Sequence, residues 1–312
     1  MKFSSPFILK CLLLISFLAV LGGCTNSKIV LSTIYNRLDN QIRDEFNKLG
    51  KFEDWQKKEF EHRLQTFHYW HRRQELPRYA VLLKEMSNVI KTKGKMTKAN
   101  ANGWSASLED FVESVQECYP AHFAADLMHT LKPEQIRFIE KRFAREQYKN
   151  RTKYAVKTRD QRMQARLKDI VKYSSLAGFK FTAEQKAMLL ASMHKTKSLH
   201  SEYYALTGRW NKKLFNALRQ KNRHDFETNL KNHLGTLYDL VENNHPEKLE
   251  YNREVWREFT VDFVNSLTNE QRTWVSSYLR TLGKNLNSIS KSKVKFKAHK
   301  NSTKGCIPGA GA

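Results

Sequence analysis

Glycine and proline, the residues that most often turn a backbone, are scarce: the 312-residue chain has 12 glycines and 6 prolines. Sandwiches and barrels of short strands need frequent turns, so this scarcity argues against them and favours long helices. Apolar residues make up 40% of the chain, which is enough for a real core. We therefore predict an all-α fold, a multi-helix bundle of long amphipathic helices.

Motifs of common catalytic and metal sites are also missing. The chain has no Gly-x-Ser-x-Gly, His-Glu-x-x-His, phosphate-loop or dinucleotide-binding motif, and no zinc-like spacing of cysteine and histidine. His68, His71 and Glu75 could share one helix face as a metal or acid–base set. The alternative is a polar cluster between two helices, in which Arg72 or Arg73 pairs with Glu75. We favour the cluster, and predict a non-enzymatic protein without metal or cofactor.

An apolar run near the N-terminus is too short to cross a bilayer. It covers residues 11–21, whereas a spanning helix needs about 20 apolar residues. The run ends in Leu21-Gly22-Gly23-Cys24, the pattern of a bacterial lipobox, in which a large aliphatic and two small residues precede a lipidated cysteine. We predict a signal peptide at residues 1–23, cleavage between Gly23 and Cys24, and covalent lipid on Cys24.

The residue after the cysteine bears on location. It is Thr25, whereas an aspartate there usually retains such lipoproteins in the inner membrane of Gram-negative bacteria. We therefore predict attachment to the outer membrane, facing the periplasm, and a helical envelope domain at residues 24–286. No aspartate or glutamate follows Glu270, and low apolar content predicts a disordered basic tail at residues 287–312.

Positive charge dominates the chain, with a formal net charge of +24. Such an excess usually indicates nucleic acid, but an envelope location argues against that partner. Anionic phospholipid, lipopolysaccharide, peptidoglycan carboxylates or an acidic envelope protein fit the charge and the compartment better. The alternative, a solvated basic surface without a specific ligand, stays open.

Two clusters of cations are candidate binding sites. The first is a ridge at four-residue steps on a helix predicted from Gln135 to about Tyr173. Its members are Lys141, Arg145, Lys149, Lys153 and Lys157. Each step drifts by about 40° around a helix, so the five side chains form one slanted row. The second cluster is an anion-binding candidate, because guanidinium groups bind carboxylate and phosphate well. It consists of Arg72, Arg73 and Arg78, beside Trp70 and Tyr79.

Apolar periodicity and turn residues predict where helices begin and end. We expect one helix from Val30 to near Gly50, a second from Phe52 to about Gln74, and a kink or restart at Pro77. Residues 91–103 are polar and predict a loop. A recurring phrase marks three helix starts, because its glutamine can close a capping box. Its copies are Leu131-Lys-Pro-Glu-Gln135, Phe181-Thr-Ala-Glu-Gln185 and Leu267-Thr-Asn-Glu-Gln271. Their unequal spacing argues against a solenoid.

Two cysteines remain once the signal peptide and the lipidated residue are set aside. Cys118 and Cys306 could pair in an oxidising periplasm. The alternative is a buried thiol at Cys118 and an exposed one in the tail. The spacing does not decide between them.

Several phrases together resemble a known family. In order behind the lipobox come Tyr35-Asn-Arg-Leu-Asp39, Trp70-His-Arg-Arg-Gln-Glu-Leu-Pro-Arg-Tyr79, and the phrases ending in Gln135 and Gln185. They resemble a family of uncharacterised proteobacterial lipoproteins, over the chain to about residue 285. The resemblance implies a helical, lipidated envelope protein and implies no activity.

A second similarity concerns small periplasmic stress chaperones, which share a Leu-Thr-x-x-Gln phrase. Leu267-Thr-Asn-Glu-Gln271 matches it, and the other two copies match imperfectly. Helix capping explains the phrase without shared function. We expect a binding or scaffold module for an anionic envelope component or a protein partner, with a chaperone as the alternative and an envelope enzyme third.

Overall fold

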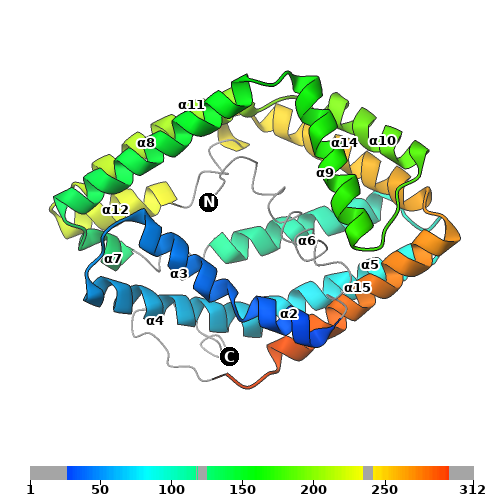
Figure 1. The fold of residues 1–312 in the computed structure, drawn as a ribbon, viewed down its shortest axis with the longest axis horizontal. Coiled ribbons are helices and arrows are strands. Elements are labelled where there is room, and N and C mark those ends of the chain that lie inside the picture. The colour runs from blue at the N-terminus through cyan, green and yellow to red at the C-terminus, as the bar shows by residue number, and fades with distance from the viewer. Residues whose placement is uncertain (1–26, 117, 119–124, 235–241, 295–312) are drawn as a thin grey trace.

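The described part of this computed structural model, residues 27–116, 118, 125–234 and 242–294, contains helices, turns and short connections, and no strand. The predicted all-α class is confirmed. In chain order the helices are α2 (Lys28–Tyr35), α3 (Leu38–Leu49), α4 (Asp54–Trp70), η1 (His71–Glu75), α5 (Leu76–Lys91), α6 (Lys98–Gln116), α7 (Ala125–His129), α8 (Pro133–Ala155), α9 (Arg159–Leu176), α10 (Ala183–Lys195), α11 (His200–Leu218), α12 (Arg223–Leu234), α14 (Pro246–Asn265) and α15 (Asn269–Ser290). In Figure 1 most helices lie around the rim of a ring, and α6 crosses its middle.

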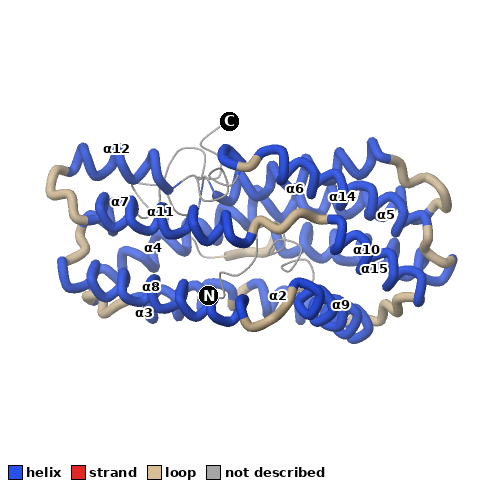
Figure 2. Tube along the Cα trace, turned by 90° about the horizontal axis from the view of Figure 1, so that it is seen from above, coloured by secondary structure: helices blue, strands red, loops and turns tan. Residues whose placement is uncertain are grey.

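The ring has two sides, seen when it is turned by 90° (Figure 2). Helices α2, α3, α8 and α9 lie along one side, and α6, α12 and α14 lie along the other. We call the first of these the α8 side.

Several helix boundaries differ from those expected. The single helix predicted from Val30 to near Gly50 is divided into α2 and α3, with a turn at Asn36 and Arg37. The two helices have different partners, because α2 packs on α15 whereas α3 packs on α4 and α8. The predicted loop is shorter, since Thr97 Oγ1 accepts a hydrogen bond from Asn100 N at 3.2 Å and α6 begins at Lys98. Residues 287–290, placed in the tail by composition, continue α15, where Ile289 is buried.

Pro77 restarts the helix without breaking it. Between α4 and α5 the chain widens into one π-helical turn, η1, in which Leu76 N donates to the carbonyl of His71. Pro77 stands in the first turn of α5, where a missing N–H costs no helical hydrogen bond. The wide turn places Arg72 and Glu75 in the interior, where each is almost completely buried.

The recurring phrase starts three helices, as predicted. Gln135, Gln185 and Gln271 each accept from the backbone N–H of a residue three positions earlier, at 2.9 to 3.1 Å. Two further boxes, not anticipated, start α4, where Glu53 N donates to Gln56 Oε1, and α9, where Thr158 N donates to Gln161 Oε1, both at 2.9 Å. The starts of α4, α8, α10 and α15 share this bond to the glutamine, and at α10 and α15 a threonine hydroxyl completes the box.

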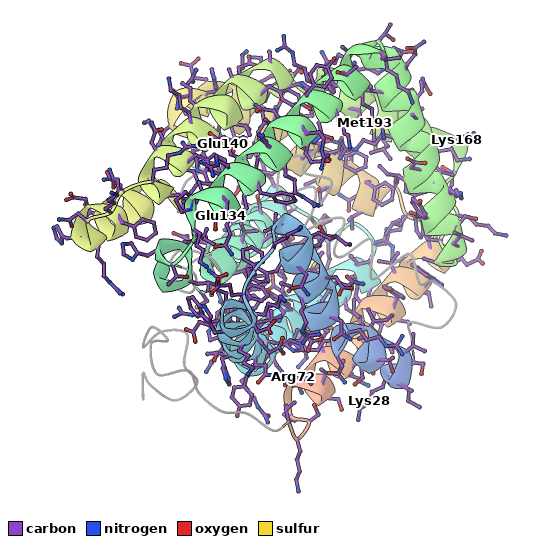
Figure 3. All side chains as sticks on the ribbon, turned by 60° about the vertical axis from the view of Figure 1, so that its left-hand side comes forward. Lys28, Arg72, Glu134, Glu140, Lys168 and Met193 are labelled. Atoms are coloured by element: carbon purple, nitrogen blue, oxygen red, sulfur yellow. The ribbon has the colours of Figure 1, made fainter. Side chains whose placement is uncertain are left out.

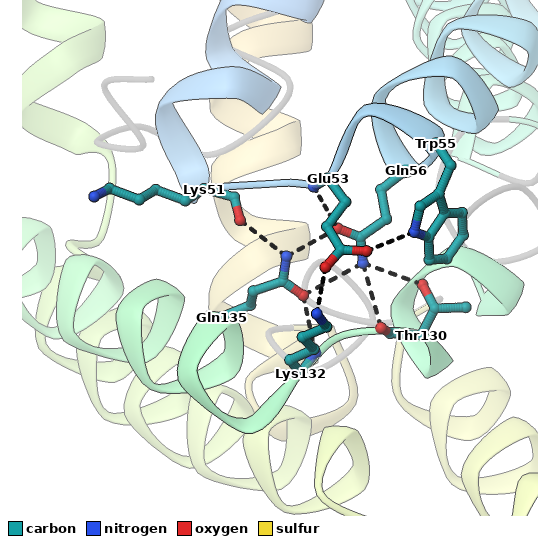
Figure 4. Close-up of polar contacts among 7 residues, drawn as sticks. All are labelled: Lys51, Glu53, Trp55, Gln56, Thr130, Lys132 and Gln135. Atoms are coloured by element: carbon teal, nitrogen blue, oxygen red, sulfur yellow. Dashed lines mark hydrogen bonds and ion pairs between the residues drawn. The ribbon is translucent and has the colours of Figure 1, made fainter.

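These glutamines pair across the fold. Gln135 Nε2 donates to Gln56 Oε1 at 2.8 Å, and Gln56 Nε2 donates back at 3.3 Å (Figure 4). Gln135 Nε2 also reaches the carbonyl of Lys51 at 2.9 Å, and Gln56 Nε2 reaches that of Thr130 at 3.3 Å. Each side-chain amide thus bonds to the other amide and to a backbone carbonyl just before the other helix, so these buried polar groups have partners.

The second pair repeats this network. Gln185 Nε2 donates to Gln271 Oε1 at 2.8 Å, and Gln271 Nε2 donates back at 2.9 Å. Gln271 Nε2 reaches the carbonyl of Lys180 at 2.7 Å, and Gln185 Nε2 reaches that of Ser266 at 3.4 Å. Lys180 and Ser266 stand five residues before their glutamines, as Lys51 and Thr130 do in the first pair.

The chain therefore contains one arrangement twice, in a first half around Lys51 to Gln135 and a second half around Lys180 to Gln271. Lys51-Phe52 and Gln56-Lys57 recur as Lys180-Phe181 and Gln185-Lys186, and the phrase ending in Gln135 recurs in the one ending in Gln271. Helices of one half pack on helices of the other: α5 of the first half lies on α15 of the second, and α11 of the second lies on α8 of the first. Likewise α6 packs on α14 and α12 on α7. The two halves interlock around the ring.

Candidate anion-binding face

The cationic ridge is exposed but spans two elements. All five cations are exposed, and Lys141 to Lys153 lie on α8. The single helix expected over residues 135–173 is interrupted, because Thr158 begins α9 with a capping box, in which Thr158 N donates to Gln161 Oε1 at 2.9 Å. Lys157 therefore lies in the connection. We call the exposed surface of α8, with this connection, the α8 face.

Few carboxylates neutralise this face. Lys149 pairs with Glu146 at 3.3 Å, and among the described residues no other ridge cation has a carboxylate within 4.0 Å. Glu140 pairs with Arg219, the residue that follows α11. Further exposed cations extend the positive surface along α8 and α9: Arg137, Arg151, Lys168 and Lys172. Lys168 is labelled on α9 in Figure 3.

Large apolar side chains stand among these cations. Phe138 is 47% exposed, Tyr148 71% and Val156 77%. Tyr148 follows Arg145 by three residues and Phe138 precedes Lys141 by three, so they share the ridge's side of the helix. The sequence reading found the cations and missed these neighbours, although the three- and four-residue spacing could have revealed them.

The inner surface of α8 is fixed by packing. Ile136 and Ile139 are buried in a cluster with Phe215 of α11, and Phe143 meets that ring edge-on at a centroid distance of 5.7 Å. Gln147 Nε2 donates to the carbonyl of Tyr204 at 3.4 Å. Because α11 holds one surface of α8, the opposite surface presents the cations in a set orientation.

The predicted arginine patch has partners inside the protein. Arg72, 2% exposed, donates to the carbonyl of Ile289 at 3.3 Å and to Ser292 Oγ at 2.9 Å (its place in the fold is labelled in Figure 3). Arg73 donates to the carbonyl of Ser290 at 2.6 Å. Two cations at the carbonyl end of α15 stabilise that helix terminus. Anion binding here stays a prediction, and the anion would have to displace these carbonyl oxygens from the two guanidinium groups.

Arg78, the third member of the patch, is the arginine that pairs with Glu75. Its Nη1 donates to Glu75 Oε1 at 2.7 Å, so the expectation that Arg72 or Arg73 fills this role was wrong. Ser114 Oγ donates to the same carboxylate oxygen at 2.9 Å, and Arg78 also pairs with Asp110 of α6. The polar cluster ties the wide turn to α5 and α6.

His71 belongs to this closed junction. Its Nδ1 lies 3.0 Å from the hydroxyl of Tyr35, and its Nε2 lies 3.3 Å from the hydroxyl of Tyr79. Burial, together with nearby His68 and Arg72, lowers the pKa of His71 to about 3. A neutral ring held between two phenols is a structural element. Among the described residues no group of three or more potential ligands could hold a metal ion.

Other predicted features lie at or beyond the edge of the described residues. Cys24, Gly23 and the signal peptide lie outside them. Cys118 is buried beside Trp70 and is disulfide-bonded, and its partner lies outside the described residues, so pairing with Cys306 stays a prediction. Within the described part of the chain, no helix combines the length and the apolar character needed to span a membrane.

Comparison with known proteins gives one match. Residues 51–245 match the model of DUF6279, a family of unknown function. The chain belongs to this family. The matched region begins at Lys51, two residues before the first glutamine box, and ends before α14, so it is shorter at both ends than the predicted resemblance. No curated protein and no solved structure matches the chain. Membership in a family of unknown function is confirmed, and lipidation stays a prediction.

Proposed function

We propose that this DUF6279 protein is a non-enzymatic binding or scaffold module, anchored by lipid on Cys24 to the outer membrane and facing the periplasm. Its α8 face would bind an anionic envelope component. The observation that carries the proposal is the row of exposed cations, of which only Lys149 has a carboxylate partner among the described residues. Surface cations without carboxylate partners attract anions over a distance of about 10 Å at 0.1 M salt.

The structure's polar interior supports a non-enzymatic role. The clusters of buried polar side chains around Gln56 and Gln185 are occupied by bonds that join helices. Glu75 accepts from Arg78 and Ser114 through Oε1, while its Oε2 has no partner among the described residues. The bonds between helices fix the fold and engage the paired amides. The α8 face is different, because its charges lie on the part of α8 that α11 and α3 leave exposed.

Site-specific photo-crosslinking in intact cells tests the proposal. A photoreactive amino acid at Arg145 should capture an anionic envelope component, and one at Lys84 should not. Lys84 is also exposed, but it lies on α5, across the ring from α8 (Figure 1). Adducts of equal yield and identity from both positions would refute a specific role for the face. Loss of the Arg145 adduct in the Cys24→Ala variant would link the interaction to the anchor.

A chaperone role is the second candidate, and the exposed side chains of Phe138, Tyr148 and Val156 favour it. Unfolded clients would contact such groups through apolar segments. The two candidates differ in their response to salt. An anionic partner should be released by 0.5 M NaCl because the charges are screened, whereas apolar client binding should persist.

A further inference from the structure

We propose that the α8 side of the ring lies against an anionic phospholipid surface, with the α8 face in contact with the headgroups. This inference rests on the proposed function and names its ligand. The surface is that of the membrane to which Cys24 would be attached. The α8 side of the ring then faces the membrane, and α6, α12 and α14 lie on the side that faces away from it.

The first support is the mixture of side chains on the α8 face. Phosphate headgroups attract lysine and arginine, and the acyl boundary below accepts aromatic and aliphatic groups. The α8 face offers both, with Tyr148 71% and Val156 77% exposed beside Lys149 and Lys153. Carboxylates of a peptidoglycan network would account for the cations and leave these apolar side chains without a partner.

The second support comes from the duplication, because α15 occupies the position of α8 in the other half. Counting from the paired glutamines, the positions of the first four ridge cations are held in α15 by Ser277, Thr281, Asn285 and Ile289. None of these four is charged. The cations are therefore specific to α8 and not part of the repeated arrangement, since the counterpart helix is packed along its length and Ile289 is 1% exposed.

The third support is the place of the anchor. Cys24 precedes α2 by only a few residues, and α2 lies on the same side of the ring as α8 and α9 (Figure 2). A chain tethered at Cys24 therefore has α2 next to the membrane. The exposed Ile29, 77% accessible on α2, and the α8 face then lie on the side of the ring that is tethered.

Vesicle sedimentation with the soluble Cys24→Ala chain tests this inference. The probes are phosphatidylglycerol–phosphatidylcholine vesicles, pure phosphatidylcholine vesicles and lipopolysaccharide dispersions. We expect binding to the anionic vesicles and at least tenfold weaker binding to pure phosphatidylcholine. Lys141→Gln/Lys153→Gln should weaken binding by about tenfold or more, since each cation near an anionic surface contributes up to about 1 kcal/mol.

Matched controls come from α5. Lys84→Gln/Lys91→Gln removes the same charge from two exposed lysines, and binding should change by less than twofold. Val156→Gln and Val81→Gln replace similarly exposed valines, 77% and 68% accessible, and only the first should weaken binding. Circular dichroism confirms that each variant retains its helices. Equal losses from the α5 and α8 variants would overturn the inference.

The outcomes separate the ligand from the general proposal. If the chain fails to bind anionic vesicles while the Arg145 crosslink in cells persists, the phospholipid assignment is wrong and the proposed function stands. Binding to lipopolysaccharide with none to phosphatidylglycerol also overturns the phospholipid assignment. If both the vesicle binding and the crosslink are absent, the proposed function fails as well.

Discussion

The helix pairs α5–α15 and α11–α8 occupy equivalent places in the two halves, yet they are packed very differently. In the first pair Gly283 of α15 lies so close to Ala80 that an added Cβ would meet the Ala80 carbonyl oxygen at 3.1 Å. At the equivalent crossing Gly208 of α11 faces Gln147 of α8, and an added Cβ would stand 3.5 Å from the Gln147 amide. One crossing is backbone against backbone, and the other is spaced by a side chain.

This difference extends along both helices. Helix α15 has buried residues from Arg272 to Ser290, whereas the buried residues of α8 end at Ile139. Arg272 is buried and donates to the carbonyl of Ile90 at 2.9 Å, and its counterpart on α8, counting from the paired glutamines, is the apolar Ile136. The comparison indicates that α15 is packed into the ring along its length, whereas the buried residues of α8 lie in its first two turns.

The glutamine pairs should give the largest effects on stability. Gln56 and Gln185 are completely buried, so replacing either by leucine leaves the partner amide and a helix start unsatisfied. We expect each single change to cost about 3 kcal/mol in the free energy of unfolding. The double variants Gln56→Leu/Gln135→Leu and Gln185→Leu/Gln271→Leu should cost less than the sum of their parts. Additive losses in urea denaturation, in either half, would contradict the reciprocal pairing.

The two glycine crossings should respond in opposite directions. Gly283→Ala should destabilise the fold by about 2 kcal/mol, because the new methyl group meets backbone that cannot move aside. Gly208→Ala should be neutral or stabilising by up to about 1 kcal/mol, because alanine favours the helix and its contact is ordinary. Thermal melts of the two variants measure the contrast. Equal destabilisation by both would remove the proposed difference in packing.

His71 and its counterpart His200 should differ in their effect on acid stability. Both have a lowered pKa, to about 3 for the buried His71 and about 4 for the partly exposed His200. The unfolded chain protonates near pH 6.5, so between that pH and the folded pKa it binds more protons, and the free energy of unfolding falls as pH falls.

For His71 this fall should reach about 1.4 kcal/mol per pH unit. His71→Gln should remove that part of the slope between pH 6 and pH 4.5, measured by urea denaturation. His200→Gln should change the slope less, because solvent screens a partly exposed ring. His62, exposed on α4, serves as the control position. An unchanged slope for His71→Gln would show that this ring is not buried in its neutral form.

The ridge should matter least for folding. Replacing Lys141 and Lys153 by glutamine should change the free energy of unfolding by less than about 0.5 kcal/mol, as for other exposed sites. The same variant should lose anion binding, so these lysines should affect binding without affecting the stability of the fold. A loss above 1 kcal/mol would mean that the lysines support the fold. In that case the contrast between α15, whose residues support the fold, and α8, whose exposed cations do not, would be wrong.

Local rules predicted much of the fold. Scarce glycine and proline pointed to helices, and the capping phrases marked the starts of α8, α10 and α15. Breaks set by packing were missed, such as the turn at Asn36, because α2 and α3 meet different partners far along the chain. The ridge was readable from its spacing. The roles of Arg72 and Arg73 were not, because the carbonyls they bind lie some 217 residues away.

The duplication was also within reach of the sequence. Lys51-Phe52 and Gln56-Lys57 match Lys180-Phe181 and Gln185-Lys186, but Glu53 replaces the threonine and hides the fourth phrase. Pairing of the glutamines could not be predicted, because nothing local brings residues 56 and 135 together. The exchange of α5 and α11 between the halves depends in the same way on long-range packing.

Depth-dependent fluorescence quenching tests the central claim most directly. An environment-sensitive fluorophore would be attached to a cysteine at Tyr148 on α8 or at Tyr251 on α14, in the Cys24→Ala chain. Both tyrosines are exposed, and the helices that carry them lie on opposite sides of the ring (Figure 2). With phosphatidylglycerol vesicles containing brominated lipid, we predict quenching at position 148 and none at 251. Quenching at 251, or at neither position, would contradict a membrane-facing α8 side.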